Sequence, residues 1–176
     1  MKLIEYVNGS RQALYHGTFL DVAMEIVKDG YISSETQQQI NNKTVYGVSL
    51  SRNPNVSYKF GNIIFKINPL ALNQKKLIPY NWVHLNPKEK MSPREEAEEF
   101  YIDDIIINSK IISIIYILKI NPRYGKDIED FFNENIEQFI NLLKTKNIQY
   151  KDFSYKLNPS NYELHTGQII NKKEEE

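Results

Sequence analysis

Cysteine is absent from this 176-residue chain, and histidine occurs only three times. The lack of cysteine excludes disulfide bonds, thiolate catalysis and cysteine-based zinc sites. The three histidines, His16, His84 and His165, are too few and too far apart in sequence to indicate a histidine-rich metal cage. The sequence therefore predicts chemistry that needs no metal.

A net charge and a long apolar segment are missing as well. Lysine plus arginine and aspartate plus glutamate are equal at 22 each, so no overall basic field marks a general polyanion binder. The longest apolar stretch, residues 111–118, is far shorter than the roughly 20 residues of a membrane-spanning helix. The N-terminus lacks the apolar region of a signal peptide. We expect a cytoplasmic protein without a membrane partner.

The chain length favours a single domain, expected over residues 1–158, followed by a poorly ordered tail over 159–176. Apolar periodicity predicts one helix that Thr18 caps and Gly30 ends, and another over about 127–146. Residues 33–43 are polar and without period, which predicts a mobile loop. Strands are predicted at 13–16, 45–51, 62–67, 77–82, 100–102, 105–107, 111–120 and within 147–155, with a short helix at 54–60.

Three short motifs carry the candidate chemistry. The tetrapeptide Tyr15-His16-Gly17-Thr18 ends the first predicted strand, where exposed main chain can hydrogen-bond a planar amide such as nicotinamide. Ser49 and Ser51 share one face of the predicted strand 45–51, because side chains alternate along a strand. An acidic run over 95–99 leads directly into the apolar residues 100–102.

The order of these motifs resembles the ADP-ribosyltransferase superfamily over about residues 13–120. The tetrapeptide is similar to the His-Gly-Thr/Ser strand of the branch that includes poly-ADP-ribose polymerases, RNA 2′-phosphotransferases and rifamycin-modifying enzymes. The resemblance implies an α+β fold in which two packed small antiparallel sheets, with peripheral helices, form a cleft for NAD. It implies NAD as co-substrate and no metal.

The resemblance also implies a role for residues of the first two motifs. His16 would bind the nicotinamide-side ribose, and the main chain of Gly17 would bind the carboxamide. Gly47-Val48-Ser49-Leu50-Ser51 matches the family's Gly-Ile-Tyr-Phe-Ala or Ser-Thr-Ser strand, which puts Ser49 at its central position. Ser57 would bond the carboxamide, and Phe60, or alternatively Tyr58, would stack on the nicotinamide ring. Further cofactor-binding candidates are Tyr15, Thr18, Ser51 and Arg52.

The third motif, Glu98-Glu99-Phe100-Tyr101-Ile102, is similar to the family's catalytic glutamate followed by an apolar strand. Glu99 directly precedes that run and is favoured, and Glu98 and Glu96 are alternatives. A carboxylate suits the reaction, because breaking the glycosidic bond of NAD develops positive charge on the ribose. The catalytic set would be His16, Ser49 and Glu99 or Glu98. The Glu-x-Glu of arginine-modifying enzymes is met only if Glu98 is catalytic, because Ala97 precedes Glu99 by two residues.

The resemblance implies an NAD-dependent mono-ADP-ribosyltransferase that releases nicotinamide and modifies a protein, a nucleic acid or a small molecule. An RNA 2′-phosphotransferase, an NAD glycohydrolase and a non-catalytic nucleotide- or protein-binding module are the alternatives. The phosphotransferase should show a cluster of basic residues, and only Arg52 lies near the motifs. The Ile-, Asn- and Lys-rich composition suggests an AT-rich source such as a phage, whose effectors or toxins act in the host cytoplasm.

Overall fold

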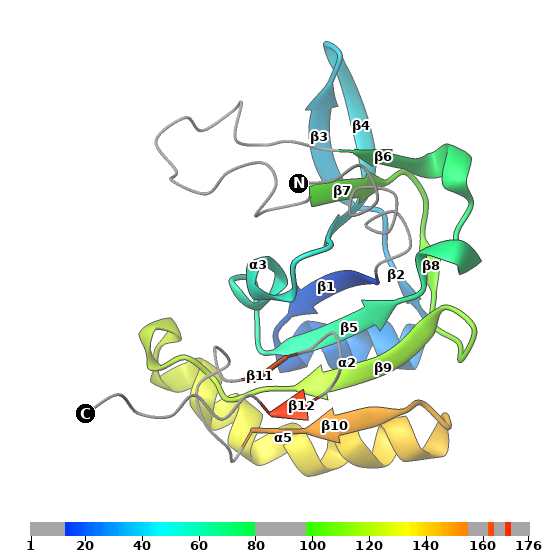
Figure 1. Ribbon diagram of the computed structural model, residues 1–176. Helices are drawn as coiled ribbons and strands as arrows, with labels where there is room; N and C mark the ends of the chain where they lie inside the picture. Colours follow the sequence, from blue (N-terminus) through cyan, green and yellow to red (C-terminus); the bar gives the residue numbers. More distant parts are fainter. Residues whose placement is uncertain (1–12, 80–97, 155–161, 164–167, 170–176) are drawn as a thin grey trace.

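The computed structural model describes residues 13–79, 98–154, 162–163 and 168–169, which combine a mostly antiparallel sheet with helices (Figure 1). The helices are α2 (Leu20–Asp29), α3 (Pro54–Tyr58) and α5 (Lys126–Thr145), with 3-10 turns η1 (Pro69–Ala71), η2 (Gln74–Lys76) and η4 (Pro122–Tyr124). The strands are β1 (Leu14–Thr18), β2 (Tyr31–Ile32), β3 (Thr36–Ile40), β4 (Lys43–Ser51), β5 (Ile63–Ile67), β6 (Leu77–Pro79), β7 (Glu98–Tyr101), β8 (Ile105–Ile106), β9 (Ile112–Ile117), β10 (Tyr150–Asp152), β11 (Tyr162–Glu163) and β12 (Gln168–Ile169). The predicted α+β class is confirmed.

The main sheet has eight strands in the order β10-β9-β5-β1-β4-β7-β6, with β3 paired to β4. Its pairs are antiparallel except for β9 and β10, which run parallel. Two further pairs, β2 with β8 and β11 with β12, lie outside this order. The predicted strand at 77–82 is described as far as Pro79, where β6 forms an edge of the sheet.

The main sheet divides into two halves at β1 and β4. Strand β1 pairs with β5 along its whole length, but it meets β4 only at the Tyr15–Ser51 pair. We call β10, β9, β5 and β1 the scaffold half, and β6, β7, β4 and β3 the hairpin half. The described strands of the main sheet are all hydrogen-bonded in one order, and a single residue pair joins the two halves, because only the last residue of β4 reaches β1. The two packed small sheets with a cleft that the resemblance implies stay a prediction.

Helices α2 and α5 cover one face of the scaffold half (Figure 1). Isoleucines of β5 and β9 form the main core together with apolar residues of β1, α2 and α5. The opposite face carries a smaller buried cluster of Tyr15, Ile64, Tyr116 and Leu118. The predicted helix 127–146 is confirmed as α5, and Gly30 ends α2 in the left-handed conformation with φ of 85°.

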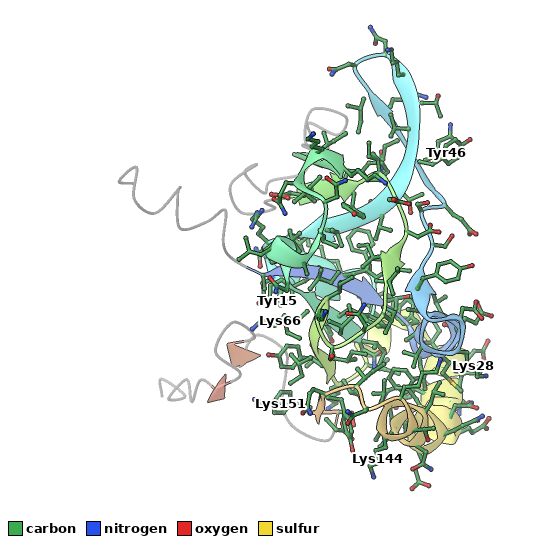
Figure 2. All side chains as sticks on the ribbon, turned by 90° about the vertical axis from the view of Figure 1, so that its right-hand side faces the viewer. Tyr15, Lys28, Tyr46, Lys66, Lys144 and Lys151 are labelled. Carbon is green, nitrogen blue, oxygen red and sulfur yellow. The ribbon has the colours of Figure 1, made fainter. Side chains whose placement is uncertain are left out.

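The mobile loop predicted over residues 33–43 is wrong. Residues 36–40 form β3, which makes a hairpin with β4 that stands out from the rest of the molecule (Figures 1 and 2). The turn consists of Asn41 and Asn42, whose φ angles of 51° and 62° suit the two-residue turn that matches strand twist. Asparagine tolerates this left-handed conformation better than other residues with a side chain. Because β3 is polar and has no apolar face, its sequence lacks the alternation of apolar and polar residues that predicts a strand.

One smaller prediction also fails. Thr18 does not cap α2, because β1 continues through Thr18, which pairs with Ile63 and is buried. The N-cap residue is Phe19, which makes no side-chain capping bond. The tail predicted over residues 159–176 is described only at β11 and β12, which pair antiparallel, and its order stays a prediction. Within the described residues, no helix is long and apolar enough to cross a membrane.

Candidate functional site

The three sequence motifs lie on neighbouring strands. The first motif occupies β1, the second β4 and the helix α3 that follows it, and the third β7. The sheet order places β1 beside β4 and β4 beside β7. Residues separated by more than 30 positions in sequence therefore meet at the junction between the two halves of the sheet.

The His16 side chain connects the two halves of the sheet next to the point where the main-chain pairing of β1 with β4 ends. Its Nδ1 lies 3.0 Å from the main-chain oxygen of Ser49, which can only accept a hydrogen bond. Nδ1 therefore carries the hydrogen, and in the neutral ring Nε2 presents a lone pair. Burial lowers the pKa of His16 below its ordinary 6.5, and the bond to Ser49 opposes this only in part. The ring is thus a neutral acceptor at pH 7.

Gly17 allows α3 to pack against β1. A Cβ atom at this position would lie 1.8 Å from the main-chain oxygen of Ser57, so a larger residue would force the two backbones apart. Ser57 strengthens the contact, because its buried Oγ donates to the main-chain oxygen of Tyr15 at 3.0 Å. Beyond Tyr15, β1 has a strand partner only in β5 among the described residues. The edge of β1 at Gly17 is therefore not covered by β4.

Tyr15 and Thr18, which stand on either side of His16 and Gly17 in the sequence, are both buried. Tyr15 belongs to the smaller cluster and lies beside Lys66 of β5 (Figure 2). Burial raises the pKa of its hydroxyl. Both residues thus fix the strand that presents His16 and Gly17.

Ser49 and Ser51 both lie in β4 and share a face, as predicted. Ser49 is partly buried, and its carbonyl oxygen holds His16. Ser51 is buried, and its Oγ accepts a hydrogen bond of 3.0 Å from the main-chain N–H of Asn53. This bond shapes the turn from β4 into α3.

The two candidate stacking residues differ in exposure. Phe60, in the turn after α3, is 59% exposed. Tyr58 packs against the smaller cluster and donates its hydroxyl to the main-chain oxygen of Lys119 at 2.8 Å. Burial raises the pKa of the Tyr58 hydroxyl. Of the two candidates, Phe60 is therefore the more exposed aromatic residue.

The register of β4 and β7 separates the candidate glutamates. In this register Glu98 pairs with Ser51, whereas Glu99 pairs with Leu50 and so occupies the face opposite to the two serines. Glu99 Oε1 accepts a hydrogen bond of 2.6 Å from Arg52 Nε, and the two side chains are only 12% and 14% exposed. Glu96 lies outside the described residues.

The Arg52–Glu99 ion pair was not predicted from the sequence. Arg52 was proposed only as a cofactor-binding residue, and Glu99 only as a candidate carboxylate. Their contact depends on the pairing of β4 with β7, which no local pattern reports. The second oxygen of Glu99, Oε2, is buried and has no hydrogen-bond partner among the described residues.

Comparisons with models of protein families and with curated proteins find no match. Within the described ranges, no group of three or more histidine or acidic residues is arranged to hold a metal ion.

Proposed function

We propose that this chain is an NAD-dependent mono-ADP-ribosyltransferase that transfers ADP-ribose to an acceptor and releases nicotinamide. The observation that supports this most is the meeting of the three motifs on β1, β4 and β7. The narrow junction between the two sheet halves is consistent with an ADP-ribosyltransferase-like fold, which is part of the proposal.

The residues at the junction suit the ribose of NAD. A ribose hydroxyl needs an acceptor, and the neutral His16 ring offers Nε2. Glu99 Oε2 is a second acceptor, and it lacks a donor among the described residues. A buried polar atom without a partner calls for an explanation, and a ligand hydroxyl supplies one. Ser49 contributes through the carbonyl that orients His16.

The nicotinamide end would use the first strand and α3. Phe60 offers an exposed ring for stacking, which favours a flat aromatic group. The part of β1 at Gly17, which β4 does not pair with, offers main-chain groups for the carboxamide. The Ser57 hydroxyl hydrogen is already donated to Tyr15, so Ser57 would contribute to the ligand only as an acceptor.

The reaction breaks the bond between ribose C1′ and the nicotinamide nitrogen, and nicotinamide leaves with the bonding electrons. Positive charge develops on the ribose, where the carboxylate of Glu99, or that of Glu98, lowers the barrier. A nucleophilic atom of the acceptor then forms the new bond to C1′ and loses its proton. The acceptor class is a protein or a nucleic acid in the cytoplasm, as for a phage or toxin effector.

The test is nicotinamide release from NAD by the full chain. Glu99→Gln should lower the rate on the order of 10²-fold or more, which is the usual effect of removing a group that stabilises charge in the transition state. His16→Ala should also slow release, and Glu98→Gln tests the alternative carboxylate. Glu137→Gln, on the exposed side of α5, is the matched control and should leave the rate unchanged. Melting temperatures show that each variant is folded.

Other outcomes point to the alternatives. NAD binding without nicotinamide release would indicate a nucleotide-binding module. Release to water, with no ADP-ribose on host proteins or nucleic acids by mass spectrometry, would indicate an NAD glycohydrolase. Loss of a 2′-phosphate from RNA would indicate the phosphotransferase. Each of these results would overturn the proposed transferase activity.

A further inference from the structure

The Arg52–Glu99 ion pair differs from the other ion pairs of the described residues. Lys76 with Asp103 and Lys126 with Asp130 are surface pairs in which every side chain is at least 41% exposed. Arg52 and Glu99 are only 14% and 12% exposed. An exposed pair contributes little to stability, and a buried one must overcome the cost of removing both charges from water. Stability alone is therefore a weak reason for this pair.

The contact holds Glu99 by one oxygen only. Arg52 Nε bonds Oε1, whereas Oε2 is buried and without a partner in the described ranges. A carboxylate that is fixed at one oxygen has its second oxygen fixed in direction as well. Arg52 follows directly on β4, which carries Ser49 and Ser51, so the contact ties the glutamate strand to the serine strand.

We propose that Arg52 is a positioning residue for the reaction, which acts through Glu99 and not by binding NAD. The guanidinium fixes the Glu99 carboxylate so that Oε2 is oriented before substrate arrives. This inference rests on the proposed function, and it selects Glu99 over Glu98 as the carboxylate that supports the reaction. It also changes the role of Arg52, which the sequence suggested as a ligand of the cofactor.

The two roles of Arg52 predict different kinetics. A residue that binds the NAD phosphates would raise KM when it is removed, because it contributes to substrate and transition state alike. A residue that orients Glu99 would lower kcat with little change in KM, because the carboxylate acts as charge develops. The second pattern is expected here, since Arg52 Nε is already bonded to Glu99.

The experiment measures kcat and KM for nicotinamide release by the full chain with NAD. Arg52→Gln should lower kcat on the order of 10²-fold, the usual effect of a misplaced catalytic group, with KM unchanged. Arg52→Lys keeps the charge without the planar guanidinium and should recover part of the rate. The double variant Arg52→Gln/Glu99→Gln should be no slower than Glu99→Gln alone, because a positioning residue acts on the reaction through Glu99.

Lys126→Gln, which removes an exposed ion pair on α5, is the matched control and should match the wild-type kinetics. If Arg52→Gln fails to fold, the double variant, which leaves no unpaired charge, and Arg52→Lys still test the inference. A raised KM at constant kcat, or losses that add in the double variant, would overturn the positioning role alone. A wild-type chain that neither binds NAD nor releases nicotinamide would remove the proposed function, and this inference with it.

Discussion

The scaffold half and the hairpin half of the main sheet use their residues differently. In β5 of the scaffold half, every residue except Lys66 is buried. In β4 of the hairpin half, Lys43, Thr44 and Tyr46 are exposed, and burial begins only at Gly47. The candidate site lies where the two halves meet, with His16 on one side and Ser49 on the other. Most of the buried apolar residues thus lie in the scaffold half, and the candidate chemical groups lie at its boundary.

The two halves differ in how much of the apolar core they contain, which suggests that the residues needed for folding and those of the candidate site are largely different. The scaffold half is covered by α2 and α5 and contains most of the apolar core. Strand β3 and the first residues of β4 extend away from that core, which Val48 and Leu50 of β4 still join, and Tyr46 is 56% exposed (Figure 2). Changes in the hairpin should therefore leave the scaffold intact. Three experiments test how far this separation holds.

The largest effect is expected in the scaffold half. Phe65→Ala removes a fully buried ring of β5 and should lower the free energy of unfolding by about 3–5 kcal/mol. Tyr46→Ala, in the exposed part of the hairpin half, should change it by no more than about 0.5 kcal/mol. Urea denaturation followed by circular dichroism measures both. Similar losses in the two variants would show that the exposed part of the hairpin contributes to stability as much as the scaffold half does.

The same difference explains which features the sequence predicted. The isoleucine-rich strands and α5 were found because each buries an apolar face, which leaves a period in the local sequence. Gly30 was found as a helix end because left-handed geometry selects glycine. The strand β3 was missed, because its threonine and glutamines have no apolar period and its turn is signalled only by Asn41-Asn42.

The candidate site, too, could be predicted only as far as local sequence patterns reach. The motif residues were identified by type and order, but their contacts depend on strand pairing. The bond of His16 to the Ser49 main chain spans 33 positions, and the Arg52–Glu99 pair spans 47. A one-residue shift of β7 against β4 would move the Glu99 side chain to the other face of the sheet. Local sequence does not specify that register, so it could not decide between the two glutamates.

An intermediate effect is expected from the pH dependence of stability at the junction. Burial lowers the pKa of His16 in the folded state, so below pH 6.5 the unfolded chain binds the proton more readily. The stability contribution is fully present above pH 6.5 and is lost as the pH falls towards the folded-state pKa. The limiting slope for one proton is about 1.4 kcal/mol per pH unit.

His16→Gln removes the titrating group and should flatten this part of the profile. The measurement is the difference in free energy of unfolding between wild type and variant from urea titrations at several pH values between 7.5 and 5. Subtraction cancels the contributions of His84 and His165. Parallel profiles for the two proteins would mean that His16 is not held in its neutral form by the junction.

The smallest effect is expected at the turn of the hairpin. Asn42 has a φ of 62°, and alanine in that conformation costs about 1 kcal/mol, so Asn42→Ala should weaken the turn by this amount. Asn42→Gly, which creates the preferred Asn-Gly turn, is the control and should be neutral or slightly stabilising. Amide hydrogen exchange should become faster in β3 of the alanine variant and stay unchanged in β5. Faster exchange in both strands would mean that the hairpin opens only together with the scaffold half, and the separation of the two halves would then fail.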